Sequence, residues 1–164
     1  MPLLTLGRYA FPTDQIVGQM KYYGIRRAAA LYGDYLGRAH ASSLAALQVG
    51  GLVPIPLHPT RFFSRGFNQA ELLARAVSEI TGLPVRTDIL RRVKWRRPQT
   101  QVGYKKRSKN VRGVFVADPA GSATRLAIVD DVVTTGSTVL QARSALEDAG
   151  QTVVAVLAIA GGGG

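Results

Sequence analysis

Two adjacent carboxylates followed by a run of small, hydroxyl-bearing residues give this sequence its clearest chemistry. Asp130 and Asp131 come directly after four apolar residues, 126–129. The run that follows is Thr134, Thr135, Gly136, Ser137 and Thr138. Backbone N–H groups and hydroxyls at a helix N-terminus bind anions such as phosphate. Paired carboxylates would repel a second phosphate but accept hydrogen bonds from neighbouring ribose hydroxyls, so the segment predicts a site for a phosphorylated sugar.

Each of these features has a simpler interpretation when it is taken alone. Two aspartates after a strand can form a solvated turn. Thr138 and Gln141 have the spacing of a capping box that only starts a helix. The combination of strand, paired carboxylates, turn and helix within residues 126–138 favours the sugar-phosphate site over either interpretation.

The segment 126–138 resembles the ribose-5-phosphate motif of type I phosphoribosyltransferases, which bind phosphoribosyl pyrophosphate (PRPP). The resemblance implies that Asp130 and Asp131 hold the ribose hydroxyls and that residues 134–138 hold the 5′-phosphate. It also implies Mg²⁺, which would be bound through PRPP rather than by protein side chains. No zinc is expected, because the chain has no cysteine and only two histidines.

The pyrophosphate of PRPP requires donors at the end of a different strand of the sheet. The resemblance to type I phosphoribosyltransferases implies that the loop Pro56-Leu57-His58 supplies backbone N–H groups for it. Arg65 follows this loop, and a guanidinium pairs with phosphate oxygens in bidentate fashion. The alternative is a rigid, proline-rich turn with no chemical role.

Further residues resemble one family within this superfamily, the ComF/GntX family. The most specific match is the string Arg65-Gly66-Phe67-Asn68-Gln69. The other matches are Ile55–His58, Lys21–Gly24, Arg92, Gln101, Arg107, Asn110 and Asp130-Asp131. ComF-like proteins have the phosphoribosyltransferase fold and are associated with DNA uptake in natural competence. The resemblance gives no clear role to Lys21, Asn68, Gln69 and Asn110, although Asn68 has the pattern of a helix cap.

This chain departs from the ComF pattern at its N-terminus. Family members commonly carry an N-terminal zinc ribbon built from paired cysteines, whereas this chain has none and begins where the ribbon would end. We therefore expect the ribbon to have been lost or removed by truncation. Partner or nucleic-acid contacts of the ribbon are not carried over to this chain.

The positive charge of the chain is concentrated in one segment. The net charge is +11, and ten of the 21 Lys and Arg residues lie within residues 91–112, where no acidic residue occurs. One interpretation is a flexible lid that places cations on the departing pyrophosphate, through Gln101, Tyr104, Lys105, Lys106 and Arg107. In another, which is compatible with the first, Trp95 and Tyr104 stack on the bases of single-stranded DNA. A solvated loop without a partner is least favoured.

Apolar periodicity predicts the elements that would position these residues. Helices are expected over residues 14–23, 25–39, 68–81 and from the hydroxyl-rich turn to 149. Strands are expected at 52–55, 89–90, 114–116, 126–129 and 153–160. The alternation predicts a single α/β domain with a central parallel sheet, here a type I phosphoribosyltransferase-like fold with an N-terminal helical hood. Its expected bounds are 14–160, between a tail at 1–13 and a Gly-rich tail at 161–164.

Composition limits the classes of protein to which the chain belongs. It has 164 residues, 46% of them hydrophobic, and no apolar run long enough for a membrane span, so we expect no membrane insertion. Without a signal-peptide pattern, cytoplasm is the expected location. The leading hypothesis is a PRPP-binding, phosphoribosyltransferase-like protein of the ComF family, which transfers or only binds a 5-phosphoribosyl group. The alternative is a non-enzymatic factor that handles single-stranded nucleic acid. A nucleobase salvage enzyme is less favoured, because no segment offers a nucleobase hood.

Overall fold

The computed structural model describes residues 1–8, 25–57, 66–93, 113–119 and 124–162. Within them, strands and helices alternate along most of the chain, as the sequence predicted. The elements are β1 (Leu3–Arg8), α2 (Ile25–Ala46), β2 (Gly51–Pro54), α4 (Gln69–Thr81), β3 (Leu90–Arg92), β4 (Phe115–Ala117), β5 (Arg125–Val133), α5 (Ser137–Asp148) and β6 (Thr152–Gly161).

The predicted central parallel sheet is confirmed. Its strand order is β1-β6-β5-β2, and all neighbouring strands are parallel. β5 is an inner strand, and its residues Leu126–Val129 are fully buried. Because parallel strands end at the same edge of a sheet, β5 carries Asp130 and Asp131 to the edge where β2 also ends.

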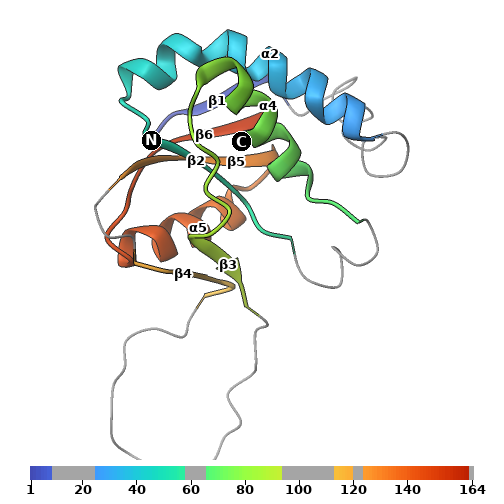
Figure 1. Cartoon of the computed structure of the whole chain (residues 1–164). Coiled ribbons are helices and arrows are strands. Elements are labelled where there is room, and N and C mark those ends of the chain that lie inside the picture. The colour runs from blue at the N-terminus through green and yellow to red at the C-terminus, as the bar shows by residue number, and fades with distance from the viewer. Residues whose placement is uncertain (9–24, 58–65, 94–112, 120–123, 163–164) are drawn as a thin grey trace, which may run out of the picture.

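Helices cover both faces of this sheet. In Figure 1, α2 and α4 lie on one face, and α5 lies on the other with the two-stranded antiparallel ribbon formed by β3 and β4. Side chains alternate across β5 accordingly. Ala127 and Val129 belong to the core that includes α2 and α4, whereas Leu126 and Ile128 belong to the core that includes α5.

α2 and α4 approach each other at two glycines of α2. A Cβ on Gly33 would lie 2.5 Å from the Cβ of Ala76, and a Cβ on Gly37 would lie 2.9 Å from that of Ile80. Glycine thus permits the close packing that holds α4 against the sheet. α2 runs to Ala46, beyond the predicted end at 39, because its last residues are good helix formers. The chain has left the helical conformation at Gln48, whose φ is 53°.

The two ends of the chain also differ from the sequence-based expectation or lie beyond the description. No strand was predicted within 1–13, yet Leu3–Arg8 form β1 beside β6, with Leu3 and Leu6 partly exposed at this sheet edge. Gly161, assigned to the tail, is the last residue of β6, and Leu3 packs against it. The predicted helix 14–23 falls outside the described residues. Among the described helices, none has the length and apolar character to cross a bilayer.

Candidate functional site

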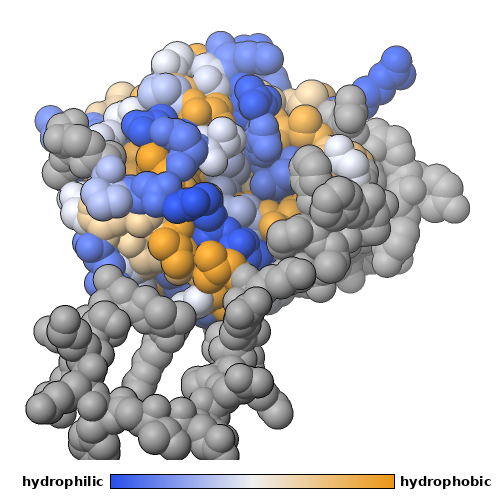
Figure 2. All heavy atoms as spheres, turned by 60° about the horizontal axis from the view of Figure 1, so that its bottom comes forward, coloured by the Kyte–Doolittle hydropathy of each residue, from blue (hydrophilic) through white to orange (hydrophobic). Residues whose placement is uncertain are grey.

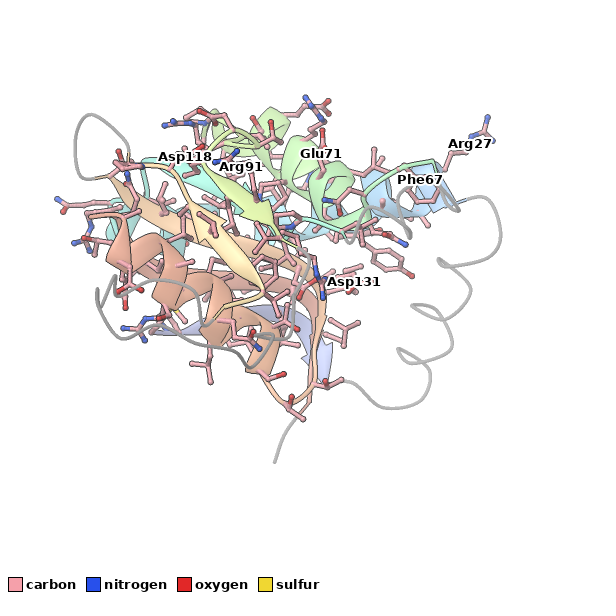
Figure 3. All side chains as sticks on the ribbon, turned by 90° about the horizontal axis from the view of Figure 1, so that it is seen from below. Arg27, Phe67, Glu71, Arg91, Asp118 and Asp131 are labelled. Carbon is pink, nitrogen blue, oxygen red and sulfur yellow. The ribbon has the colours of Figure 1, made fainter. Side chains whose placement is uncertain are left out.

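The paired aspartates belong to β5 itself rather than to the turn after it. The predicted end of the strand at 129 was wrong, because pairing with β6 continues through Val132↔Ala160 and Val133↔Gly161. Asp130 pairs with Ala158, which belongs to the core on the α5 face. Pairing with β6 therefore fixes the backbone of both aspartates. In Figure 3, Asp131 lies on the same side of the view as Phe67, which precedes α4.

Backbone hydrogen bonds hold the two carboxyl groups. The N–H of Asp131 donates to Oδ1 of Asp130 at 2.9 Å, and the N–H of Val132 donates to Oδ1 of Asp131 at 2.8 Å. One oxygen of each carboxyl group is thereby held next to the strand. Each carboxyl group keeps further acceptor capacity, which hydroxyl donors of a ligand can use.

The electrostatic environment of Asp130 disfavours its charged form. Burial and then the negative charge of Asp131 raise the pKa of Asp130 to about 7, while the positive charge of Arg92 acts in the opposite direction. Asp130 is thus near its titration midpoint at neutral pH. Asp130 is mostly ionised only above that pH.

The hydroxyl-rich turn lies where β5 passes into α5. Gly136 precedes the helix with φ 74°, a conformation that glycine adopts without strain. It has no side chain to cap the first turn, and the exposed hydroxyls of Thr135 and Ser137 hydrogen-bond to each other at 3.3 Å. Gln141 donates to the carbonyl of Ser137 at 3.3 Å rather than completing a capping box with Thr138. The helix N-terminus therefore presents N–H groups and hydroxyls suited to an anion.

The second predicted part of the site begins at the end of β2. The N–H of Ile55 donates to the carbonyl of Val129 at 2.9 Å, which brings Pro56 and Leu57 beside the end of β5. Pro56 and Leu57 are partly buried. The structure therefore brings the start of the predicted pyrophosphate loop together with the aspartates. His58 and Arg65 fall outside the described residues.

Asn68 ties α4 to the same edge of the sheet. Its Oδ1 accepts a hydrogen bond from the N–H of Ala70 at 3.1 Å, which confirms the predicted cap. Its Nδ2 donates to the carbonyl of Ile55 at 3.0 Å. Gln69 follows with 2% of its surface exposed, and its Nε2 has no hydrogen-bond partner among the residues that the structure describes. Asn68 is thus a positioning residue for the loop after β2.

The basic segment 91–112 begins within the β3–β4 ribbon, since Arg91 and Arg92 belong to β3. The N–H of Val93 donates to the carbonyl of Val114 at 2.9 Å, which joins the chain on the two sides of residues 94–112. Figure 2 shows hydrophilic and hydrophobic residues side by side on the face that carries the ribbon and α5. The remaining predicted residues fall outside the description, namely Lys21, Gln101, Tyr104, Lys105, Lys106, Arg107 and Asn110.

The placement of Arg92 was not predicted from the sequence, where Arg92 was one of the matches to the ComF/GntX family and one of the ten cations within residues 91–112. The guanidinium carbon of Arg92 lies 5.4 Å from the centre of the Phe115 ring, and its charge acts on Asp130. The sequence feature that could have indicated this placement is the alternation of side chains along β3. Leu90 is buried, Arg91 is exposed and Arg92 is partly buried.

A metal centre made by the protein alone has no support among the described residues. Within the described ranges, no group of three or more His, Cys, Asp or Glu side chains is arranged to hold a metal ion. Binding of Mg²⁺ through a ligand stays a prediction.

Comparison with known proteins finds relatives whose sequences align with almost the whole chain. Competence protein F of Haemophilus influenzae is 30% identical over 165 residues, which cover 96% of this chain and 72% of that protein. DNA utilization protein YhgH of Escherichia coli K12 is 29% identical over 157 residues, which cover 94% of this chain and 69% of that protein. No family model matches the chain.

Among solved structures, the chain is similar to adenine phosphoribosyltransferase from Leishmania tarentolae. The TM-score is 0.39 with 17% sequence identity, over 74% of this chain and 56% of that chain.

Proposed function

The chain belongs to the competence protein F family, and from that premise we propose that it binds PRPP with Mg²⁺ where β2 and β5 end. One observation carries the proposal. A single inner strand, β5, delivers two adjacent carboxyl groups directly into a glycine turn at the N-terminus of α5. A phosphorylated ribose needs these two kinds of partner side by side.

Each part of PRPP then has a partner of matching chemistry. The ribose hydroxyls donate to Asp130 and Asp131, and the 5′-phosphate accepts from residues 134–138. The pyrophosphate accepts from the loop that begins at Pro56-Leu57, with Arg65 as a charged partner. This division agrees with two hydrogen bonds at Ile55, one that joins the end of β2 to β5 and one from Asn68.

The arrangement suits transfer of the 5-phosphoribosyl group. In that reaction the C1–O bond of PRPP breaks, pyrophosphate leaves with the bonding electrons, and an acceptor nucleophile forms the new bond to C1. The carboxylates lie near the positive charge that develops on the sugar, and cations from the basic segment would offset the charge of pyrophosphate. No covalent nucleophile on the protein is required.

Titration of PRPP with Mg²⁺ at pH 8, followed by calorimetry, tests the sugar site. We expect saturable binding to the unmodified chain and a loss of at least about a hundredfold in affinity for Asp130→Asn/Asp131→Asn, because hydrogen bonds to charged groups are each worth about 1.5–3 kcal/mol. Glu79→Gln, an exposed carboxyl on α4, is the control and should bind as the unmodified chain does. Equal binding by all three proteins, or none, would overturn the assignment.

The names of the relatives favour a second candidate function. Two of them are called competence protein F and DNA utilization protein, and this chain carries ten cations within residues 91–112. We propose that the chain acts in DNA uptake or use and that this segment contacts single-stranded DNA. Stacking aromatics and cations that follow a phosphate backbone are the features of such contacts.

Binding of single-stranded DNA at several salt concentrations tests this second function. Replacing Arg96, Arg97, Lys105 and Lys106 with alanine should lower the affinity and reduce the slope of log K against log salt by roughly three, since each lost phosphate contact contributes about 0.7. The control removes four cations elsewhere, at Arg27, Arg38, Arg75 and Arg143, and should keep most of the slope. Absence of binding even at low salt contradicts the proposal.

A further inference from the structure

The end of β6 lies against the hydroxyl-rich turn of the candidate site. Figure 1 shows β6 beside β5, and the pairing of the two strands ends at Val133↔Gly161. One residue further along, the N–H of Gly162 donates to the carbonyl of Val133 at 2.7 Å. Because Val133 is the last residue of β5, this hydrogen bond holds Gly162 directly beside the start of the turn.

There is no room for a side chain between Gly162 and Thr134, the first residue of the turn. A Cβ at position 162 would lie 3.0 Å from the carbonyl oxygen of Thr134, 3.2 Å from its Cα and 3.4 Å from its carbonyl carbon. Carbon atoms in favourable contact are about 3.5–4.0 Å apart. All three contacts are with backbone atoms, which cannot turn aside as the end of a flexible side chain can. Any other residue at position 162 would therefore push the backbone of Thr134 away from β6.

Glycine is needed at position 162 because of space rather than because of backbone conformation. Gly162 is not one of the described glycines that have a positive φ. Gly136, inside the turn, is the opposite case. Its φ is 74°, and a Cβ on it would make only an ordinary contact with Val133, at 4.0 Å. Alanine at position 162 would therefore meet no conformational strain of its own and would disturb only the contact with Thr134.

The turn is anchored in the core at both ends and exposed between them. Val133 before the turn and Val139 after it are buried in the core that includes α5. Thr134 and Thr135 are exposed. The contact with Gly162 therefore sets how closely the start of the turn approaches β6, while the hydroxyl groups of the turn stay accessible to a ligand.

We propose that Gly162 is a positioning residue of the sugar-phosphate site, because the space left by its missing side chain lets Thr134 lie where the turn can bind the 5′-phosphate. This inference rests on the proposed function and extends its site to the end of β6. Binding groups have to be held within about 0.5 Å of their productive geometry, and a Cβ at position 162 would displace Thr134 by a few tenths of an ångström. Gly162 acts through the backbone of Thr134 rather than by touching the phosphate.

The amide signals of the turn, followed by ¹⁵N NMR in the full chain without ligand, test the contact directly. Gly162→Ala should shift the signals of residues 134–136, and Gly162→Val should shift them further, because a branched side chain needs more room. Gly161→Ala is the matched control, since Gly161 pairs with the same strand but a Cβ on it would meet the side chains of Leu3 at 2.9 Å and Thr5 at 3.4 Å. It should shift signals of β1 rather than those of the turn. Unchanged turn signals in folded Gly162→Val would overturn the inference.

Calorimetry with ribose 5-phosphate gives a second readout, which separates this inference from the proposed function. Gly162→Ala should bind ribose 5-phosphate about tenfold more weakly than the unmodified chain, which is the effect of losing one hydrogen bond to a charged group. Pyrophosphate with Mg²⁺ should bind both proteins equally, a result that a general loss of structure would not produce. Equal affinity of the two proteins for ribose 5-phosphate would overturn the inference. If the unmodified chain binds neither ligand, the proposed function fails, while the NMR shifts still decide whether Gly162 positions the turn.

Discussion

Replacing Ser137 with aspartate is expected to abolish PRPP binding while making the folded protein more stable. Ser137 is the first residue of α5, and the first turn of this helix has no acidic residue. A carboxylate there would interact favourably with the helix dipole, which is worth about 0.3–1 kcal/mol. The same carboxylate would lie next to the 5′-phosphate. Two like charges about 4 Å apart repel by about 4 kcal/mol near a protein surface, so affinity should fall at least about a thousandfold.

Calorimetric titration with PRPP and Mg²⁺, together with urea unfolding, measures both effects of Ser137→Asp. The matched control is Ser144→Asp, which places the same charge on an exposed position of the same helix. This control should bind PRPP as the unmodified chain does. Retained affinity in Ser137→Asp would show that the phosphate does not lie at the N-terminus of α5.

The second large effect concerns Asp130, whose replacement by asparagine should stabilise the ligand-free protein at pH 8. Burial and the charge of Asp131 raise the pKa of Asp130 to about 7, whereas an aspartate in an unfolded chain has a pKa near 3.9. Between about pH 4 and 7 the folded state therefore binds more protons than the unfolded state. The free energy of unfolding consequently falls as pH rises through this window.

Asparagine at position 130 keeps the side-chain oxygen that accepts a hydrogen bond from the N–H of Asp131, but it carries no negative charge. We expect Asp130→Asn to raise the free energy of unfolding at pH 8 by roughly 2–4 kcal/mol, and by less than about 1 kcal/mol near pH 4. Urea unfolding at the two pH values measures this difference. A variant that is equally or less stable than the unmodified chain at pH 8 would mean that Asp130 is not held in an unfavourable charged state.

These two substitutions have a common physical basis. The N-terminus of α5 lacks a carboxylate that would stabilise it, and Asp130 at the end of β5 lies beside Asp131 in a setting that disfavours the charge of Asp130. Both features lower the stability of the ligand-free protein. Natural proteins accept such local costs chiefly where function requires them. A bound phosphorylated ribose would relieve both, since it brings an anion to the helix and donors to the carboxylates.

The central part of the fold could be predicted from the sequence because burial leaves a clear pattern. Residues 126–129 and 153–160 are unbroken apolar runs, and the structure places both in inner strands of the parallel sheet. α4 was equally clear, since Asn68 caps its start and its expected end at 81 is the observed one. β1 was missed because an edge strand is covered on fewer sides, and Leu3–Arg8 accordingly has a mixed pattern.

The candidate site was predictable only where its residues are contiguous. The aspartates and the hydroxyl-rich turn form one segment, so their juxtaposition follows from the chain itself. The hydrogen bonds from Ile55 and Asn68 and the influence of Arg92 join strands far apart in sequence. Three-residue strands such as β3 and β4 give too short a pattern for their register to be predicted.

A crystal structure of the chain soaked with PRPP and Mg²⁺ would show whether the sugar-phosphate site lies where β2 and β5 end. We expect the 5′-phosphate at the N-terminus of α5, in contact with residues 134–138. We expect the ribose hydroxyls at Asp130 and Asp131, and the pyrophosphate at the loop after β2. PRPP bound away from the shared end of β2 and β5, or with its ribose turned away from both aspartates, would contradict this placement.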